Sequence, residues 1–233
     1  MLAADICSFG YGASRNKAKW ELSSKTLCNA CLLVIDGQKK YLHNTTAASC
    51  LPHILTLIRC AKQRKIPVYW TRFTRIEGQS SFAGEAHHDF VGGGEAVEQR
   101  ILQGDEDIIP EIGPRRNGFS EDSVFETHAY SSFSNKSLAK RLRSHGSVVI
   151  CGGWSDFCVL TTCFDAIDRD LKVVIAKDAV FSGARSAERK VDGWSKQIMA
   201  NGCGRVELTE KVVRQLQLHK SPDHGTENTR ATS

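Results

Sequence analysis

The sharpest change of pattern in this chain lies in one segment, Val149-Ile150-Cys151-Gly152-Gly153-Trp154-Ser155-Asp156-Phe157-Cys158-Val159-Leu160. Its first residues form an uninterrupted apolar run, which is typical of a strand buried on both faces of a parallel sheet. Two glycines and a Ser-Asp pair follow, and apolar residues then return at helical spacing. The segment therefore predicts a buried strand, a tight turn and a helix whose N-cap is Ser155.

On this interpretation Cys158 lies in the first helical turn, three residues after the cap. The unpaired amides and the positive end of the helix dipole face this turn. They would lower the pKa of the thiol from its ordinary value of about 8.5, because they stabilise the thiolate. A cysteine placed in this way can act as a nucleophile. The alternative is that Cys158 is a small buried residue beneath the helix, as cysteines often are.

The rest of the chain alternates between the same two kinds of element. Strands are predicted at 31–35, 66–71, 123–127, 147–151, 172–176 and 204–208. Helices are predicted at 46–64, 136–144, 156–169, 185–200 and 209–217, with a short helical piece near 95–103. This alternation predicts a three-layer, doubly wound α/β fold, in which helices cover both faces of a six-stranded, mainly parallel sheet.

One domain accounts for most of the length. We expect an irregular lead-in over 1–27, the α/β domain over 28–218 and a disordered polar tail over 219–233. The long glycine-rich connection from Glu77 to about Asp122 is weakly patterned. A connection of this length usually serves function, often as a lid or a pocket wall.

Composition excludes several classes of protein. The net charge of +5 comes from interspersed charges of both signs, without a basic stripe that carries aromatic residues, so we expect no nucleic-acid partner. No apolar run approaches the roughly 18 residues of a membrane span, and the N-terminus lacks the pattern of a secretory signal. The nine cysteines are odd in number and mostly lie in apolar runs, which favours free thiols in the cytoplasm.

Cofactor and metal signals are weak. Cys28 and Cys31 form a CxxC pair without a second pair, and His87-His88-Asp89 has no further ligand at a suitable spacing. The first strand is followed by Asp36-Gly37-Gln38 rather than by a glycine-rich phosphate loop. We therefore expect neither a metal nor a cofactor, and a small molecule as the substrate.

Asp36 is the second candidate catalytic residue, because it follows a buried strand at the carboxyl edge where α/β folds place their chemistry. The alternative is an ordinary turn aspartate. Arg72 and Arg75 follow the second strand and could bind a carboxylate. We expect Tyr69, Trp70, Phe133 and Trp154 to wall the pocket, although such aromatic residues more often belong to a core.

Five motifs together resemble the isochorismatase-like, or cysteine hydrolase, superfamily. They are Leu32-Leu33-Val34-Ile35-Asp36-x-Gln38, Ile66-Pro67-Val68, Tyr130-Ser131-x-Phe133, Cys151-Gly152-Gly153-Trp154-Ser155-Asp156-x-Cys158-Val159 and Lys177-Asp178-Ala179. They occur in the order and spacing of the family over about residues 30–210.

The resemblance implies a triad of Asp, Lys and Cys, with Asp36 as general acid/base and Cys158 as nucleophile. It also implies a cis peptide bond between Gly153 and Trp154, an oxyanion hole made by the amides of Trp154 and Cys158, and a dimer or larger oligomer. The position of the family's lysine is occupied by Thr127, which cannot carry the positive charge. Lys136, nine residues later, is a possible substitute.

Two chemistries occur in the superfamily, and the residues leave both open. Amide hydrolysis uses the thiolate, whereas cleavage of an isochorismate-type vinyl ether uses a protonated carboxylic acid. Because a missing cation beside Asp36 favours the protonated acid, the sequence places vinyl ether cleavage first and amide hydrolysis second. A catalytically silent interaction protein is the third interpretation. Substrate contacts are expected from Gln38, Trp70, Arg72, Phe133, Gly153 and Trp154, with Arg115 and Arg116 as further cations for a dicarboxylate.

Overall fold

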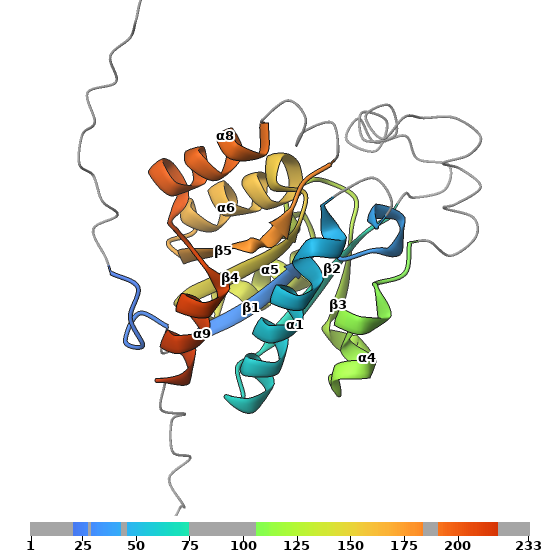
Figure 1. Cartoon of the computed structure of the whole chain (residues 1–233), viewed down its shortest axis with the longest axis horizontal. Helices are drawn as coiled ribbons and strands as arrows, with labels where there is room; N and C mark the ends of the chain where they lie inside the picture. Colours follow the sequence, from blue (N-terminus) through green and yellow to red (C-terminus); the bar gives the residue numbers. More distant parts are fainter. Residues whose placement is uncertain (1–20, 28, 43–45, 75–105, 184–190, 219–233) are drawn as a thin grey trace, which may run out of the picture.

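The sheet defines the architecture of the computed structural model, which describes residues 21–27, 29–42, 46–74, 106–183 and 191–218. Its six strands lie in the order β3-β2-β1-β4-β5-β6, and every neighbouring pair is parallel. The strands are β1 (Ala30–Ile35), β2 (Val68–Phe73), β3 (Val124–Thr127), β4 (Ser147–Gly153), β5 (Lys172–Phe181) and β6 (Arg205–Glu207) (Figure 1).

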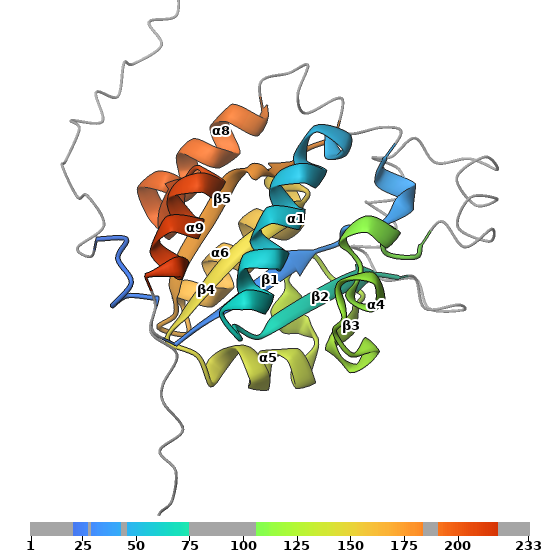
Figure 2. The same cartoon turned by 60° about the horizontal axis from the view of Figure 1, so that its bottom comes forward.

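Helices cover both faces of this sheet, as Figures 1 and 2 show. One face packs against α1 (Ala47–Gln63) and α9 (Thr209–Gln217), and the other against α5 (Lys136–Arg143) and α6 (Leu160–Ile167). The remaining described helical segments are α4 (Pro114–Asn117), α8 (Val191–Ile198), the short η1 (Lys39–Tyr41), η2 (Pro110–Ile112), η3 (Glu121–Ser123) and η4 (Ser132–Ser134), and the wide turns η5 (Ser155–Val159) and η6 (Met199–Cys203). The predicted three-layer α/β fold is confirmed.

The central strands are apolar throughout because both of their faces are covered. In β1, Leu32 and Val34 pack on the side of α1, whereas Leu33 and Ile35 pack on the side of α6. All six residues of β1 are buried. This explains why the sequence shows a continuous apolar run there rather than an alternating one.

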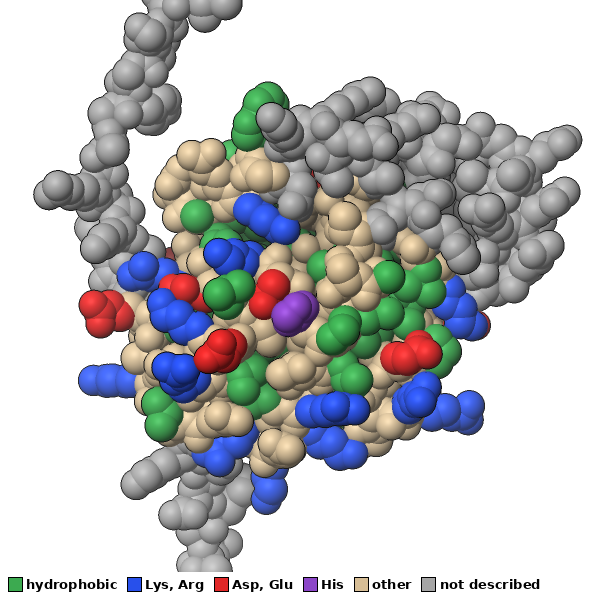
Figure 3. Space-filling model, viewed as in Figure 1, with side chains coloured by type: hydrophobic (Ala, Val, Ile, Leu, Met, Phe, Trp, Pro, Cys, Tyr) green, Lys and Arg blue, Asp and Glu red, His purple; other side chains and the backbone are tan. Residues whose placement is uncertain are grey.

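The described surface carries charges of both signs. On the face that Figure 3 shows, acidic side chains lie among Lys and Arg in the middle of the view, and its lower part carries Lys and Arg side chains. Among the described helices, none combines the length and the apolar character that crossing a bilayer requires.

The order of the strands reverses beside β1. From β1 the chain builds β2 and β3 on one side, then returns to place β4 on the other side. The segments that leave the carboxyl ends of β1 and β4 therefore diverge from a common point, which is where ligands bind in open α/β sheets. Ile35 at the end of β1 pairs with Gly152 of β4. As a result, Asp36 and the turn that carries Cys158 begin side by side.

Gly152 and Gly153 allow the backbones to approach closely at this point. Gly152 has a φ of +101°, and a Cβ there would lie 2.0 Å from the carbonyl oxygen of Ile35. A Cβ on Gly153 would lie 2.1 Å from the ring of Phe181. A side chain at position 152 would push β4 away from β1, and one at position 153 would displace the buried ring of Phe181.

Replacing Gly152 with alanine is expected to lower the free energy of unfolding by about 3 kcal/mol or more, because strained backbone and a backbone clash add together. Urea denaturation of the variant measures this change. The matched control is Gly146→Ala, since a Cβ there meets nothing within 4 Å; it should change the free energy by no more than about 0.5 kcal/mol. Equal losses in the two variants would contradict the prediction.

The predicted start of the helix at Ser155 is wrong. The cap is Trp154, whose backbone is extended, and its carbonyl accepts hydrogen bonds from the amides of Phe157 (3.2 Å) and Val159 (3.0 Å). The chain therefore enters a wide turn, η5, before α6 begins at Leu160. The hydroxyl of Ser155 is buried and has no hydrogen-bond partner among the described residues. Its polarity suggested a cap, but no side chain caps this turn with a hydrogen bond.

Other boundaries differ by a few residues. Strand β2 begins and ends two residues later than predicted, and β5 continues five residues further, to Phe181. The lead-in up to residue 20, the tail from 219 and the helical piece near 95–103 lie outside the described residues, as do His87-His88-Asp89 and Arg75. The domain boundaries therefore stay predictions.

Candidate active site

Asp36 and Cys158 meet at the carboxyl ends of β1 and β4. The carboxyl group of Asp36 is 2% exposed, and the thiol of Cys158, which is 4% exposed, donates a hydrogen bond to it. The amide of Asp36 donates to Oγ1 of Thr71 (3.1 Å), which leaves the Thr71 hydroxyl to donate to Oδ1 of Asp36 (2.6 Å). Thr71 thus fixes the orientation of the carboxylate toward the sulfur.

Burial dominates the electrostatics of this pair. It raises the pKa of Asp36, while the hydrogen bonds from Thr71 and Cys158 and the charge of Lys40 oppose the rise. It also raises the pKa of Cys158 well above its ordinary value, and the negative charge of Asp36 adds to that rise. The predicted lowering of the thiol pKa is therefore wrong, because the loss of water on burial outweighs the backbone donor and the positive charge of Lys40.

The turn before Cys158 places a backbone donor beside the sulfur. The peptide bond between Gly153 and Trp154 is cis. The backbone N–H of Trp154 hydrogen-bonds the sulfur and lowers the pKa of the thiol, as does the positive charge of Lys40. The amides of Phe157 and Val159, on either side of Cys158, are turned to the Trp154 carbonyl. An oxyanion hole formed by the amides of Trp154 and Cys158 stays a prediction.

Lys40 is the site residue that the sequence analysis missed. It lies on η1, four residues after Asp36, and its side chain is 12% exposed. Its Nζ donates to the carbonyl of Phe73 (2.9 Å) and lies 3.6 Å from Oε1 of Glu106. Burial lowers the pKa of Lys40, while the negative charges of Glu106 and Asp36 oppose this. Its charge therefore acts on the catalytic pair from within the protein.

Gln38 holds the end of β2 in place. Its Nε2 donates to the carbonyls of Phe73 (3.1 Å) and Glu106 (2.7 Å), and its Oε1 accepts from the amide of Phe73 (2.9 Å). The side chain is fully buried and the backbone uses both of its donors. Gln38 therefore positions the backbone that Lys40 binds, rather than offering a free amide to a substrate.

Five aromatic rings, which we call the aromatic collar, adjoin the pair. Tyr41 contacts Trp154 (5.3 Å between ring centroids), Trp154 contacts Phe157 (6.3 Å), Phe157 contacts Tyr130 (5.3 Å) and Tyr130 stacks on Phe73 (6.5 Å). Nζ of Lys40 lies 5.3 Å from the centre of the Tyr41 ring and 5.6 Å from that of the Phe73 ring. Lys40 therefore contacts the rings at both ends of the collar. Burial raises the pKa of both Tyr41 and Tyr130, and a negative charge on Cys158 would add to that rise in each of them, so the collar lies beside the sulfur.

Three predicted substrate contacts make their interactions elsewhere. Trp70 is fully buried in the core, and its indole N–H donates to the carbonyl of Ile112 (2.8 Å). Arg72 pairs with Glu126 and lines a cavity of about 490 Å³ together with Arg115 and Arg116. Phe133 is buried, with the guanidinium of Arg169 over its ring at 4.8 Å. Tyr69 likewise packs against Phe125 and His145. By contrast, the structure brings Gly153 and Trp154 to the sulfur-bearing turn.

Thr127 and Lys136 lie together, but not as a source of charge for Asp36. Thr127 is buried at the end of β3, Lys136 is exposed at the start of α5, and both line a cavity of about 570 Å³. Thr127 pairs with Phe73 of β2, and Lys40 binds the carbonyl of this same Phe73. The ammonium group of Lys40 therefore sits at the end of β2, beside the strand on which the resemblance places a lysine.

Comparison with known proteins agrees with this geometry. The sequence profile described as "Isochorismatase domain" matches residues 30–204, which span both Asp36 and Cys158. The chain belongs to the isochorismatase family.

Its relatives include proteins with different named activities. "Nicotinamidase 3" of Arabidopsis thaliana is 29% identical over 155 residues, covering 64% of this chain and 72% of that protein. The phenazine biosynthesis protein PhzD1 of Pseudomonas aeruginosa is 24% identical over 205 residues, covering 85% and 90%. A crystal structure of a cysteine hydrolase from Pseudomonas syringae pv. phaseolicola superposes with a TM-score of 0.70 at 21% identity, covering 88% of this chain and 99% of that one. The last of these shows the shared fold.

In the described parts of the chain, no three His, Cys, Asp or Glu side chains form a group that could hold a metal ion.

Proposed function

We propose that this isochorismatase-family hydrolase cleaves a small amide, with Cys158 as the nucleophile and Asp36 as the general acid/base. The observation that supports this most directly is the hydrogen bond from the Cys158 thiol to the Asp36 carboxylate. A nucleophile and a base within hydrogen-bond reach, with the base oriented by a third group, is the arrangement that covalent catalysis requires. Thr71 is that third group here.

The geometry leads to a two-step reaction. Asp36 accepts the thiol proton as the sulfur attacks the amide carbon, and the Trp154 and Cys158 amides stabilise the tetrahedral oxyanion. The protonated Asp36 then donates its proton to the leaving nitrogen, and an amine or ammonia departs. The thioester that remains is hydrolysed by water, which loses a proton to Asp36. That proton returns to the sulfur, which restores both groups.

The aromatic collar favours a small planar substrate. Tyr130 and Phe157 are partly exposed, whereas Tyr41, Phe73 and Trp154 are buried. Flat faces of this kind bind planar groups by stacking. Lys40 lies against the collar rings of Tyr41 and Phe73, and its charge would attract electron-rich or negatively charged substituents of the substrate.

Vinyl ether cleavage is the second candidate, and one observation favours it. Burial raises the pKa of Asp36, which keeps a larger share of the carboxyl group protonated and able to protonate a methylene carbon. The sequence places this route first because position 127 carries no charge. We place amide hydrolysis first because the Cys158 thiol is hydrogen-bonded to Asp36 and to the backbone N–H of Trp154, contacts that vinyl ether cleavage does not use.

The test uses the full chain with a planar aromatic amide, such as nicotinamide, and with isochorismate. We expect ammonia release from the amide and a thioester on the Cys158 peptide, detected by mass spectrometry after acid quenching. Turnover of isochorismate alone, without a covalent adduct, would instead support the vinyl ether route. Turnover of neither, across a panel of small planar amides, would favour the silent interaction protein.

A further inference from the structure

We infer that Lys40 is the positioning residue whose positive charge favours the ionised form of the buried Asp36, so that this carboxylate can accept the proton of Cys158. This inference rests on the proposed nucleophilic role of Cys158 and assigns the cation on which that role depends. It places the positive charge four residues after the acid, on the same short segment of chain.

Lys40 is held by contacts that leave its ammonium group little freedom. Its Nζ donates to the Phe73 carbonyl and lies against Oε1 of Glu106. Gln38 binds that same Phe73 carbonyl and also the carbonyl of Glu106, so one buried amide fixes both partners of the lysine. Two ring faces, of Tyr41 and Phe73, lie within 6 Å of the charge. A flexible surface lysine would show none of these contacts.

A buried carboxylate needs such a charge. Without a nearby cation, loss of water drives a buried aspartate to its neutral form, and a neutral carboxyl group cannot take a proton from a thiol. Burial raises the pKa of both Asp36 and Cys158, and the charge of Lys40 opposes that rise in each of them. Glu106 in turn helps to keep Lys40 protonated. Glu106, Lys40 and Asp36 thus alternate in charge, and the last of them receives a hydrogen bond from the thiol of Cys158.

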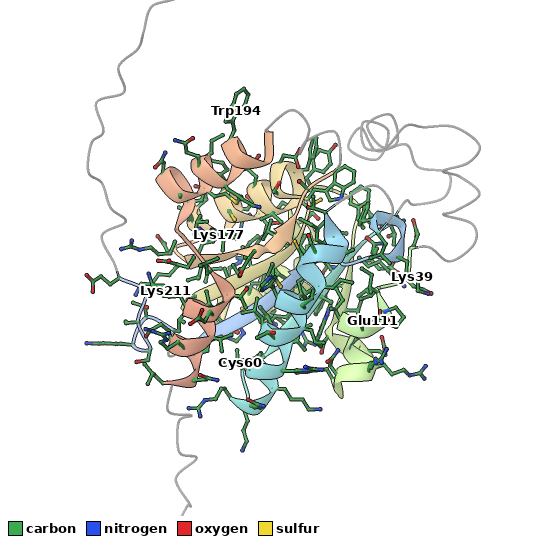
Figure 4. All side chains as sticks on the ribbon, in the orientation of Figure 1. Lys39, Cys60, Glu111, Lys177, Trp194 and Lys211 are labelled. Atoms are coloured by element: carbon green, nitrogen blue, oxygen red, sulfur yellow. The ribbon has the colours of Figure 1, made fainter. Side chains whose placement is uncertain are left out.

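Loss of the charge should therefore move the formation of the thiolate to higher pH. The direction follows because the cation stabilises the anionic forms of both groups, so that removing it raises both pKa values. Lys40→Gln is the decisive variant, since glutamine can still donate to the Phe73 carbonyl but carries no charge. Lys40→Arg keeps the charge. Lys39→Met is the matched control, because Lys39 is the adjacent lysine, its side chain is 38% exposed and it pairs with Asp107 (Figure 4).

The experiment measures the rate of Cys158 alkylation by iodoacetamide in the native full chain from about pH 7 to pH 11, because burial raises the pKa of this thiol well above its ordinary value. The Cys158 peptide is quantified by mass spectrometry, which separates it from the other cysteines. Ultraviolet thiolate absorbance, taken as the difference from a Cys158→Ala chain, gives a second readout that needs no reagent access. In Lys40→Gln we expect the pH midpoint of thiolate formation at Cys158 to rise by at least about one pH unit. At any pH below the midpoint, the fraction of thiolate then falls about tenfold. Lys40→Arg and Lys39→Met should match the wild type.

An unchanged midpoint in a folded Lys40→Gln chain would overturn the inference, and so would a failure of Lys40→Arg to restore the wild-type midpoint. The proposed function is tested separately by turnover. If the wild type cleaves no amide while its thiolate midpoint depends on Lys40, the proposed function fails and the role of Lys40 stands. If amides are cleaved and the thiolate midpoint is the same with and without the charge at residue 40, the proposed function stands and the role of Lys40 fails.

Discussion

Replacing Cys158 with alanine is expected to lower kcat for amide hydrolysis by about 10³-fold or more, since loss of a nucleophile leaves only binding and oxyanion stabilisation. The thioester adduct should disappear with it. The fold should persist, because alanine keeps the β-carbon and removes one buried sulfur atom. Steady-state kinetics and intact-protein mass spectra measure these two effects.

Cys163→Ala is the matched control for this variant. Cys163 is also buried and lies one turn further along, on α6, where its sulfur contacts that of Met199. Its loss should cost ordinary packing energy, about 1 kcal/mol, and leave kcat within about twofold. A Cys158→Ala chain that still cleaves amides at the wild-type rate would contradict the nucleophilic role. Retained turnover of isochorismate by the same variant would support the vinyl ether route instead.

Asp36→Asn is expected to lower kcat by about 10²- to 10⁴-fold, because the amide cannot take or return a proton. Asparagine is the right replacement since the backbone of Asp36 has a φ of +46°, a conformation that asparagine tolerates and alanine does not. Turnover across the pH range provides the measurement. Thr71→Val, which removes the hydrogen-bond donor to Oδ1 of Asp36, should lower kcat by less than Asp36→Asn does. It should also raise the pH at which kcat reaches half of its maximum. Full activity of Asp36→Asn would exclude both proposed chemistries.

The same variant also separates function from stability. Burial raises the pKa of Asp36 in the folded state, so its charge destabilises the fold at pH values above the unfolded pKa, and the penalty is complete above the folded pKa. Relative to the wild type, Asp36→Asn should therefore be more stable at about pH 8 than at about pH 4. Thermal unfolding at the two pH values measures the difference. A stability difference that does not change with pH would show that the pKa of the carboxyl group is the same in the folded and unfolded states, which would contradict the rise caused by burial.

Much of the fold could be predicted from the sequence because the spacing of apolar residues matches the faces of each strand and helix that are buried. The apolar runs that became β1 and β4 are buried on both faces, and α9 has the predicted bounds of 209–217. The encounter of Asp36 with Cys158 also follows from topology, since both residues come after strands that flank the reversal of strand order.

The rest depended on contacts that no local pattern encodes. Lys39 and Lys40 look alike in sequence, yet one is exposed and the other lies against Phe73 and Glu106. The collar draws Tyr41, Tyr130 and Phe157 from three separate segments. Trp70 was expected at the pocket, but its side of β2 faces the core. Ser155 resembled a cap because polarity alone does not reveal the direction of a side chain.

The two glycines at the end of β4 have a wider consequence. At Gly152 the main chains of β1 and β4 touch without any side chain between them, so backbone atoms alone set the separation between the acid and the sulfur-bearing turn. Repacking the apolar layers on either side of the sheet would then alter thermal tolerance while leaving that separation unchanged. Substitutions in the apolar layers could therefore stabilise this protein against heat or solvent without a change in its active-site chemistry, provided that Gly152 and Gly153 are kept.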